Sequence, residues 1–262
     1  MNMDDTYLRR YIKNLSIKIK YRQSPNLLCL FRQTDVTSDL CEVNEATPSK
    51  SAYITPFIST DEAFESQRIR QLQARYRDTI TRLSAYIEMR DPLGTGHAVM
   101  VARYAEAIAK ALCWRREKIE ELEIGAYLHD IGKICVTETI LNKSEQLTLK
   151  ELRQIRRHTR VGAGMIMKID FLKPVVPYVL YHHERYDGRG YPFRLSGKDI
   201  PVEGRILAVA DTFEALMNVR PYRKAMSSVL AIEEMKKLSG SQLDPDVAAI
   251  FTELLGKKEI IV

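Results

Sequence analysis

Residues 181–192 read Tyr-His-His-Glu-Arg-Tyr-Asp-Gly-Arg-Gly-Tyr-Pro. This stretch places two adjacent imidazoles, His182 and His183, at the end of an apolar segment and follows them with a glycine-rich loop. The chain of 262 residues holds only five histidines, so the pair indicates that at least one imidazole binds something. The pair alone also fits a helix C-terminus with one histidine in solvent and one in the core, closed by the glycines. The choice between these interpretations depends on the other three histidines.

The overall composition is that of a globular protein, with 45% hydrophobic and 28% charged residues. No uncharged apolar run approaches the ~20 residues of a membrane span, and residues 1–10 are polar, unlike a signal peptide. The four cysteines lie far apart without a Cys-x-x-Cys pair, which indicates neither a disulfide framework nor a thiolate zinc site. The sequence therefore predicts a cytoplasmic protein with reduced cysteines and no membrane span.

The charge balance gives only weak information about partners. The net charge of +6 suits an anionic partner, but 40 basic and 34 acidic residues supply both signs in abundance. A nucleic-acid-binding protein would show a basic stripe with interleaved aromatics or a recognisable reading module. Neither is present in the sequence, so no nucleic-acid partner is predicted.

Three regions are distinguished along the chain: residues 1–60, 61–90 and 91–262. In the first region, residues 16–21 and 26–31 have strand character, and a Thr-, Ser- and Pro-rich segment typical of a linker follows them. The role of this N-terminal region is left open. It is a sensory or receiver-like remnant, a small β element packed on the main domain, or partly disordered chain.

The second region is predicted to be one amphipathic helix of about six turns. Its apolar positions recur at steps of three and four and define one face: Ile69, Leu72, Tyr76, Ile80, Leu83 and Ile87. One interpretation docks this helix on the main domain. The other joins two protomers through a coiled coil, in a homodimer that carries a signal from the N-terminal region. Fewer than three clean heptads are present, which favours docking.

The main domain is predicted to be all-α, and its first two helices deliver three chemically active residues. A helix over residues 97–112 begins with His97, directly after a glycine-rich turn. A second helix over residues 117–131 delivers His129 and Asp130. An imidazole nitrogen and a carboxylate oxygen at adjacent positions can bind two different ions, or opposite sides of one pair of ions.

Two later helices add further candidates. One begins near Thr148, carries His158 and has an apolar face of Leu152, Ile155 and Met165. The other covers residues 202–217. It places Asp211 at the edge of an otherwise buried stripe, and burial of an unpaired carboxylate costs several kcal/mol. A bound cation explains such a carboxylate.

All five histidines lie near predicted helix termini within one continuous helical region. Together with Asp130 and Asp211 they form a mixed nitrogen and oxygen set: His97, His129, His158, His182 and His183. This set is too large for one tetrahedral ion and suits two octahedral ions that share a bridge. The softness of the ligands favours iron or manganese over magnesium or calcium.

In their order along the chain these motifs resemble the HD-GYP family, a branch of the HD phosphohydrolases. The matching motifs are His97, His129-Asp130-Ile131-Gly132-Lys133, His158, His182-His183-Glu184, Asp187-Gly188, Gly190-Tyr191-Pro192, Asp211 and Arg220-Pro221-Tyr222-Arg223. The resemblance covers roughly residues 80–255. It implies an HD-type helical bundle with a metal site at its centre, which hydrolyses the bacterial second messenger cyclic di-GMP to the linear dinucleotide or to GMP.

The resemblance also implies residue roles. The implied metal ligands are His97, His129, Asp130, His158, His182, His183 and Asp211. Asp130 and Lys133 would be catalytic, and Lys133, Arg220 and Arg223 match positions that contact substrate phosphate in the family. Tyr191 would stack on guanine or face a partner protein.

Two departures from the family pattern concern the metal site. Some relatives hold a third metal with an acidic residue four positions before the first histidine, but Leu93 stands there in this chain. We therefore expect two divalent ions, which would lower the pKa of a bridging water held in line with the phosphorus. Glu214 stands where the family commonly has aspartate, which keeps the charge and lengthens the reach.

Two other functions are compatible with the same sequence. A regulatory module could keep the fold and dock a partner, such as a diguanylate cyclase domain, through the Gly-Tyr-Pro loop. An HD hydrolase could instead act on another nucleotide, for example a mixed cyclic dinucleotide. The complete ligand set favours the cyclic di-GMP phosphodiesterase.

Overall fold

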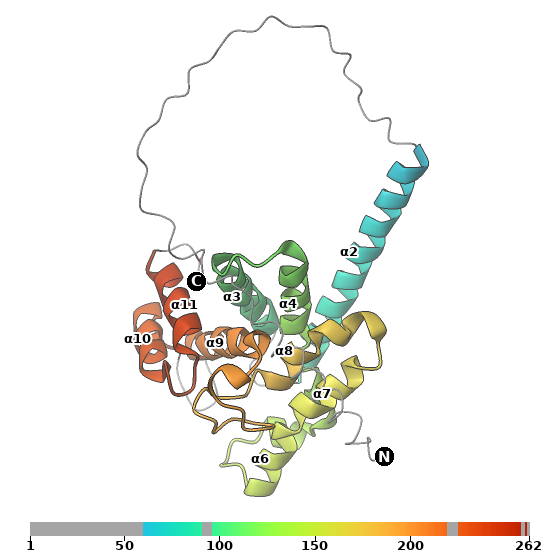
Figure 1. Cartoon of the computed structure of the whole chain (residues 1–262). Helices are drawn as coiled ribbons and strands as arrows, with labels where there is room; N and C mark the ends of the chain where they lie inside the picture. Colours follow the sequence, from blue (N-terminus) through green and yellow to red (C-terminus); the bar gives the residue numbers. More distant parts are fainter. Residues whose placement is uncertain (1–59, 91–95, 219–224, 258–259, 261–262) are drawn as a thin grey trace, which may run out of the picture.

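The computed structural model describes residues 60–90, 96–218, 225–257 and 260. Within these residues the chain is helical and contains no β-strand (Figure 1), which confirms the predicted all-α class. The strand predictions for residues 16–21 and 26–31 lie outside the described residues, as do Leu93, Arg220 and Arg223.

The described helices are short apart from the first one. In chain order they are α2 (Thr60–Glu88), α3 (His97–Ala111), α4 (Arg116–Leu128), the 3-10 turn η2 (Ile131–Cys135), α5 (Glu138–Leu141), α6 (Leu149–Arg156), α7 (His158–Ile166), η3 (Asp170–Val175), α8 (Val176–Tyr181), η4 (Gly197–Asp199), α9 (Val202–Met217), α10 (Ser228–Leu238) and α11 (Pro245–Gly256). In Figure 1, α2 extends away from the body that the other helices form. The helices of this body bring together residues that are distant in the sequence.

The core is built around α3, α8 and α9. Helix α3 packs on α4 and α9, and α8 packs on α7 and α9. The rings of Tyr104, Phe213 and Phe251 lie 5.1 to 5.7 Å apart in edge-to-face arrangements, which ties α3, α9 and α11 together. The side chain of Tyr104 is 2% exposed.

Helix α2 packs its C-terminal half against α4, η2 and α3. The side chains buried on this half are those of Ile80, Ser84, Ile87 and Glu88. The prediction that Leu83 belongs to the buried face is wrong, because its side chain is 39% exposed. The buried stripe steps from residue 80 to 84 and 87, and position 83 falls on the outer side of this stripe.

Two predicted helix boundaries are also corrected. The helix that begins near Thr148 is divided, because α6 ends at Arg156 and α7 begins at His158. Met165 is 36% exposed on α7 and does not belong to the apolar face. The helix predicted over residues 117–131 ends at Leu128, and the chain tightens into η2 from Ile131. Both breaks fall at residues of the predicted metal set.

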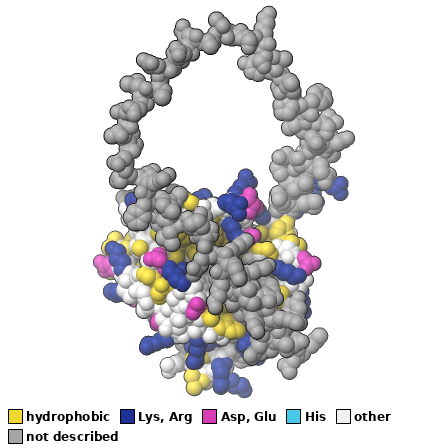
Figure 2. Space-filling model, in the orientation of Figure 1, with side chains coloured by type: hydrophobic (Ala, Val, Ile, Leu, Met, Phe, Trp, Pro, Cys, Tyr) yellow, Lys and Arg dark blue, Asp and Glu magenta, His cyan; other side chains and the backbone are white. Residues whose placement is uncertain are grey.

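The described surface carries both signs of charge. On the face in Figure 2, basic side chains are spread among hydrophobic and acidic ones and do not form a single stripe. None of the described helices combines the length and the apolar character that a membrane crossing requires.

Candidate metal centre

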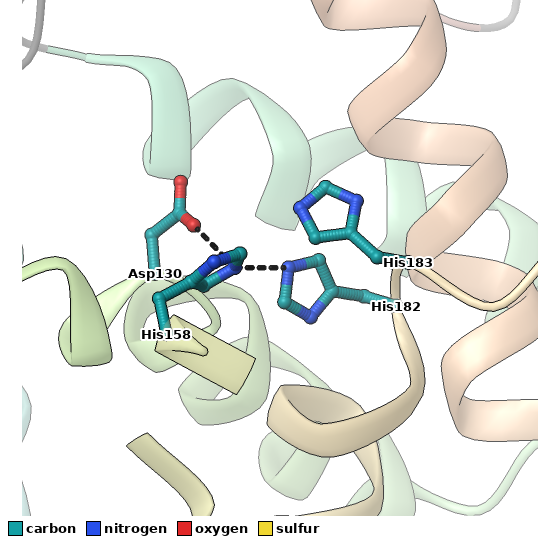
Figure 3. Close-up of side chains that lie close together, drawn as sticks. All are labelled: Asp130, His158, His182 and His183. Atoms are coloured by element: carbon teal, nitrogen blue, oxygen red, sulfur yellow. Dashed lines mark hydrogen bonds and ion pairs between the residues drawn. The ribbon is translucent and has the colours of Figure 1, made fainter. Parts of the chain in front are cut away.

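The seven predicted ligand residues come from separate elements and converge in the middle of the helical body. His97 is the first residue of α3, and His158 is the first residue of α7. His129 directly follows α4, and His182 directly follows α8. Two groups of potential ligand atoms result, with all atoms of a group within 4.8 Å of one another. The three-ligand group is His97, His129 and Asp211, and the four-ligand group is Asp130, His158, His182 and His183 (Figure 3).

Three of these histidines are oriented by the same local hydrogen bond. The Nδ1 atoms of His129, His158 and His182 lie 2.6, 2.7 and 2.9 Å from the carbonyl oxygens of the residues three positions earlier. These carbonyls stand at the ends of helices or turns, where they lack helical partners. Because a carbonyl oxygen only accepts, each Nδ1 carries the proton and donates it. The Nε2 atom of each ring then faces the centre.

His97 is oriented by a carboxylate instead. Its Nδ1 atom donates to Glu214 Oε2 at 2.5 Å, and both side chains are only 2% exposed. Its Nε2 atom therefore also faces inward, 3.4 Å from Asp211 Oδ1. The longer reach of glutamate at position 214 is thus used to contact the imidazole. An acidic partner of this kind fixes the ring and raises its basicity as a ligand.

The inward nitrogen atoms lie close enough to share a proton or a bound cation. His97 Nε2 and His129 Nε2 are 3.2 Å apart, and His158 Nε2 and His182 Nε2 are 3.3 Å apart. Two unprotonated nitrogens at this distance repel each other, and a proton or a metal cation between them removes this repulsion. Asp130 Oδ1 is buried and has no hydrogen-bond donor among the described residues. The residues therefore fit divalent ions of the kind that imidazole and carboxylate bind.

The electrostatics of the four-ligand group favour neutral imidazoles. Burial, with the neighbouring histidines, holds the pKa of His182 well below its ordinary value. Burial likewise lowers the pKa of His183 to about 3 and that of His158 below its usual range. Neutral imidazoles are the form that binds metals, so these rings need not lose a proton first.

The two carboxylates stay ionised and attract positive charge. Burial opposes ionisation of Asp130, but Lys133 and His129 hold the pKa of its carboxyl well below the ordinary value. Burial also opposes ionisation of Asp211, and His97 and His129 outweigh it, so its pKa is lowered. Burial alone would lower the pKa of His129, but Asp130 and Asp211 raise it to about 9. The field at the three-ligand group thus favours a cation.

Lys133 and Tyr191, two further candidates from the sequence, lie beside the ligand groups. Lys133 Nζ lies 2.8 Å from Asp130 Oδ2, and its side chain is 12% exposed. The ring of Tyr191 lies 4.8 Å from that of His183 and 5.3 Å from the guanidinium of Arg156. Burial raises the pKa of the Tyr191 phenol, which keeps it neutral. The predicted contacts of Arg220 and Arg223 lie outside the described residues.

A cavity of about 480 Å³ opens beside the four-ligand group. Its walls include His183, Asp211, Tyr191, Arg156, Arg189 and Glu234. Sequence reasoning missed Arg156, Arg189 and Glu234 in this role. Each looks like an ordinary surface charge in its own helix or loop, and only the packing of α6 and α10 around the loop brings them to one cavity.

The glycine-rich loop is fastened at both ends. Glu184 is 3% exposed and accepts hydrogen bonds from the backbone N–H groups of Phe193 and Leu195, at 2.6 and 3.1 Å. Arg185 donates to both oxygens of Asp187, at 3.0 and 2.7 Å, and to Gln242 Oε1 at 2.8 Å. Gln242 lies between α10 and α11, and no local sequence signal links it to this loop. These hydrogen bonds fix the conformation of the loop that carries Tyr191.

The comparisons with known proteins agree with this geometry. The chain belongs to the HD domain family, whose model matches residues 82–247. This match and the two relatives described next confirm the resemblance to the HD-GYP branch of HD phosphohydrolases.

Two relatives and one solved structure illustrate the similarity. The cyclic di-GMP phosphodiesterase response regulator RpfG of Xanthomonas campestris is 36% identical over 67% of this chain and 47% of its own length. A cyclic di-GMP phosphodiesterase of Thermotoga maritima is 35% identical over 68% of this chain and 48% of its own length. The chain thus spans about half the length of these curated relatives. The crystal structure of a cyclic GMP-AMP specific phosphodiesterase of Vibrio cholerae shares the fold, with a TM-score of 0.55 and 15% identity over 69% of this chain and 49% of that one.

Proposed function

We propose that this chain is a metal-dependent phosphodiesterase that hydrolyses cyclic di-GMP to the linear dinucleotide, to GMP or to both. One observation carries the proposal: two groups of potential ligand atoms, in buried and partly buried side chains, meet beside a cavity of about 480 Å³. The names of the two relatives that match two thirds of this chain support cyclic di-GMP as the substrate.

The proposed cofactors are two divalent metal ions, with iron or manganese favoured by the nitrogen-rich ligand set. One would be held by the three-ligand group and the other by the four-ligand group. Bound divalent ions supply Lewis acidity and a water activated for attack on phosphorus. Asp130 is the proposed bridge between the groups, since its Oδ2 lies 3.3 Å from His129 Nε2 and its Oδ1 lies 3.3 Å from His158 Nε2.

Other side chains near the ligand groups suit a phosphodiester. The Lys133 ammonium would offset charge that develops on a nonbridging oxygen, and its contact with Asp130 keeps it in place. The cavity wall also presents the guanidinium groups of Arg156 and Arg189, and a planar guanidinium meets two phosphate oxygens at once. Tyr191 offers an aromatic ring beside them for a nucleobase. Phosphate contacts from Arg220 and Arg223 remain a prediction from the family resemblance.

Hydrolysis of cyclic di-GMP by anaerobically purified protein tests the proposal directly, with bound iron and manganese quantified on the same sample. We expect turnover and about two metal ions per chain. The His129→Ala variant should keep its helical circular-dichroism spectrum and lose more than about 100-fold in rate, because even changes to residues behind metal ligands cost 10- to 100-fold. Wild-type turnover by this variant would contradict the proposed role of the centre.

The substrate range needs its own measurement. A panel of cyclic di-GMP, the mixed cyclic GMP-AMP dinucleotide and mononucleotides, assayed at equal concentration, should show the highest kcat/KM for cyclic di-GMP. A higher value for another member of the panel would assign the same site to that nucleotide.

Full metal occupancy without turnover would favour the docking alternative. The partner predicted for that case is a diguanylate cyclase domain bound at the Gly-Tyr-Pro loop, and a binding assay with wild type and Tyr191→Ala would detect it. The homodimer predicted through the helix over residues 61–90 is checked by the molar mass of the full chain in light scattering.

A further inference from the structure

The first turn of α3 lacks a cap of its own, although it carries a candidate metal ligand. The N-cap residue is Gly96, which has no side chain to accept a hydrogen bond, and the first turn contains no acidic residue. The free N–H groups at the start of a helix need acceptors and carry a partial positive charge. Their position here is critical, because His97 is the first residue of the helix.

Glu88, the last residue of α2, supplies the missing acceptor. Its Oε2 atom accepts from the N–H of Gly96 at 2.7 Å, and its Oε1 atom accepts from the N–H of Ala98 at 2.6 Å. The two hydrogen bonds flank His97 on both sides along the backbone. Glu88 is 7% exposed and Ala98 is 3% exposed, so water competes little for these bonds.

We propose that Glu88 is a positioning residue of the metal centre: it fixes the backbone of His97 and thereby completes the three-ligand group. His97 is then held by two carboxylates, by Glu88 through the backbone and by Glu214 through the ring. Only a small void of about 10 Å³ lies between the end of α2 and the rings of His97 and His129. The backbone at His97 therefore has little room to settle elsewhere while its ring stays in place.

The chain just after α2 is also fastened, to the segment that follows Lys133. Arg90 donates to the carbonyl oxygens of Ile134 and Val136 at 3.3 and 3.2 Å, and pairs with Glu138 at 3.1 Å. Glu88, in contrast, makes its hydrogen bonds within the described residues to Gly96 and Ala98, beside the three-ligand group. Its loss should therefore act on one ion and not on both.

The inference rests on the proposed metal centre. Mn²⁺ binding by the full chain tests the centre and the role of Glu88 separately. Calorimetric titration of the metal-free wild type with Mn²⁺ should show two ions per chain, and no binding would refute the centre itself. In Glu88→Ala we expect one ion to bind about 10- to 100-fold more weakly, with the other unchanged. The Mn²⁺ affinity of Glu88→Gln should lie between those of wild type and Glu88→Ala, because an amide oxygen can still accept one of the two hydrogen bonds. The matched control is Asp78→Ala, which removes an exposed carboxylate from the same helix.

A second measurement does not depend on metal. Backbone amide exchange in the first turn of α3 should be faster in Glu88→Ala and in Glu88→Gln than in wild type, and unchanged in Asp78→Ala.

In the metal titration, wild-type affinity for both ions in Glu88→Ala would overturn the assignment. An equal loss of affinity for both ions would also overturn the assignment, because it would show that Glu88 only stabilises the domain. If Glu88→Ala does not fold, the Glu88→Gln titration decides by the same criteria.

Discussion

At the scale of single residues, the centre depends on where helices stop. The imidazoles of His129, His158 and His182 each donate Nδ1–H to a carbonyl three residues earlier. The sequence predicted that the histidines lie near helix termini, and the free carbonyls at these termini explain why that position suits a ligand. The protonated nitrogen could not be predicted, because it depends on the local turn that each ring reaches back to.

Gly132 provides a test at this scale, because it lets η2 approach α7 next to two candidate ligands. A Cβ atom at Gly132 would lie 1.9 Å from the carbonyl oxygen of His158 and 2.7 Å from the N–H nitrogen of Gly162. We expect Gly132→Ala to lower the free energy of unfolding by more than about 3 kcal/mol, since backbone must move. Denaturant titration measures this change.

The control for that measurement is Gly256→Ala at the end of α11, where an added Cβ atom meets nothing within 4 Å. Alanine should be neutral there or stabilise by up to about 1 kcal/mol. Equal stability of the two variants would contradict the close approach of η2 and α7.

At the scale of elements, periodicity located the helices better than their ends. The third helix of the main domain was predicted as one piece, yet it breaks at Arg157, and His158 starts a new helix. No glycine or proline marks that break. It coincides with the point where the His158 ring turns back to the carbonyl of Ile155. The helix thus breaks where the His158 ring is placed, although the helical spacing of apolar residues continues through the sequence.

A second element-scale feature is the start of α11, where Asp244 has two tasks. Its Oδ1 atom caps the helix by accepting from the N–H groups of Asp246 and Val247 at 2.8 and 3.4 Å. Its Oδ2 atom pairs with Arg205 and with Lys198, whose Nζ lies 3.1 Å away. Burial opposes ionisation, but Arg205 and Lys198 lower the pKa of the Asp244 carboxyl.

We expect Asp244→Asn to destabilise the protein by about 3 kcal/mol at pH 7, because it keeps the cap oxygen and leaves Arg205 without its buried counter-charge. The pKa of Asp244 is lower in the folded state, so its contribution is complete above the unfolded pKa of about 3.9 and is lost as pH falls toward the folded value. The difference between wild type and variant should therefore shrink below about pH 4. Urea titrations from pH 3 to 8 measure it, with Asp246→Asn as the exposed control. A difference that persists undiminished at pH 3 would argue against the ion pair.

At the scale of the whole molecule, the all-α class was accessible from sequence, and so was the set of seven candidate ligands that the structure brings together, because several motifs occur in a fixed order. The rest of the cavity wall was not accessible, since Arg156, Arg189 and Glu234 come from three separate segments. Glu88 was likewise missed, because the helical pattern explains a glutamate at the end of α2 without further function. Such residues acquire their roles only through contacts between distant parts of the chain.

Metal removal should be visible in the stability of the whole domain. An ion that binds only the folded chain stabilises it by about 2.7 kcal/mol at a concentration 100-fold above its Kd. We expect a chelator to lower the Tm of the wild type and added Mn²⁺ to restore it. The effect should be much smaller in His129→Ala. A wild-type Tm that does not respond to chelator or to Mn²⁺ would contradict the binding of ions by the folded centre.

The distribution of the two ligand groups along the chain sets an order of assembly during synthesis. The four-ligand group lies wholly between residues 130 and 183, whereas the three-ligand group needs His97 and Asp211 together. A chain that emerges from the ribosome therefore carries the complete set for one ion before α9 has been made. A second ion could be held only after α9 has packed against α3, so its binding would report that this long-range contact has formed.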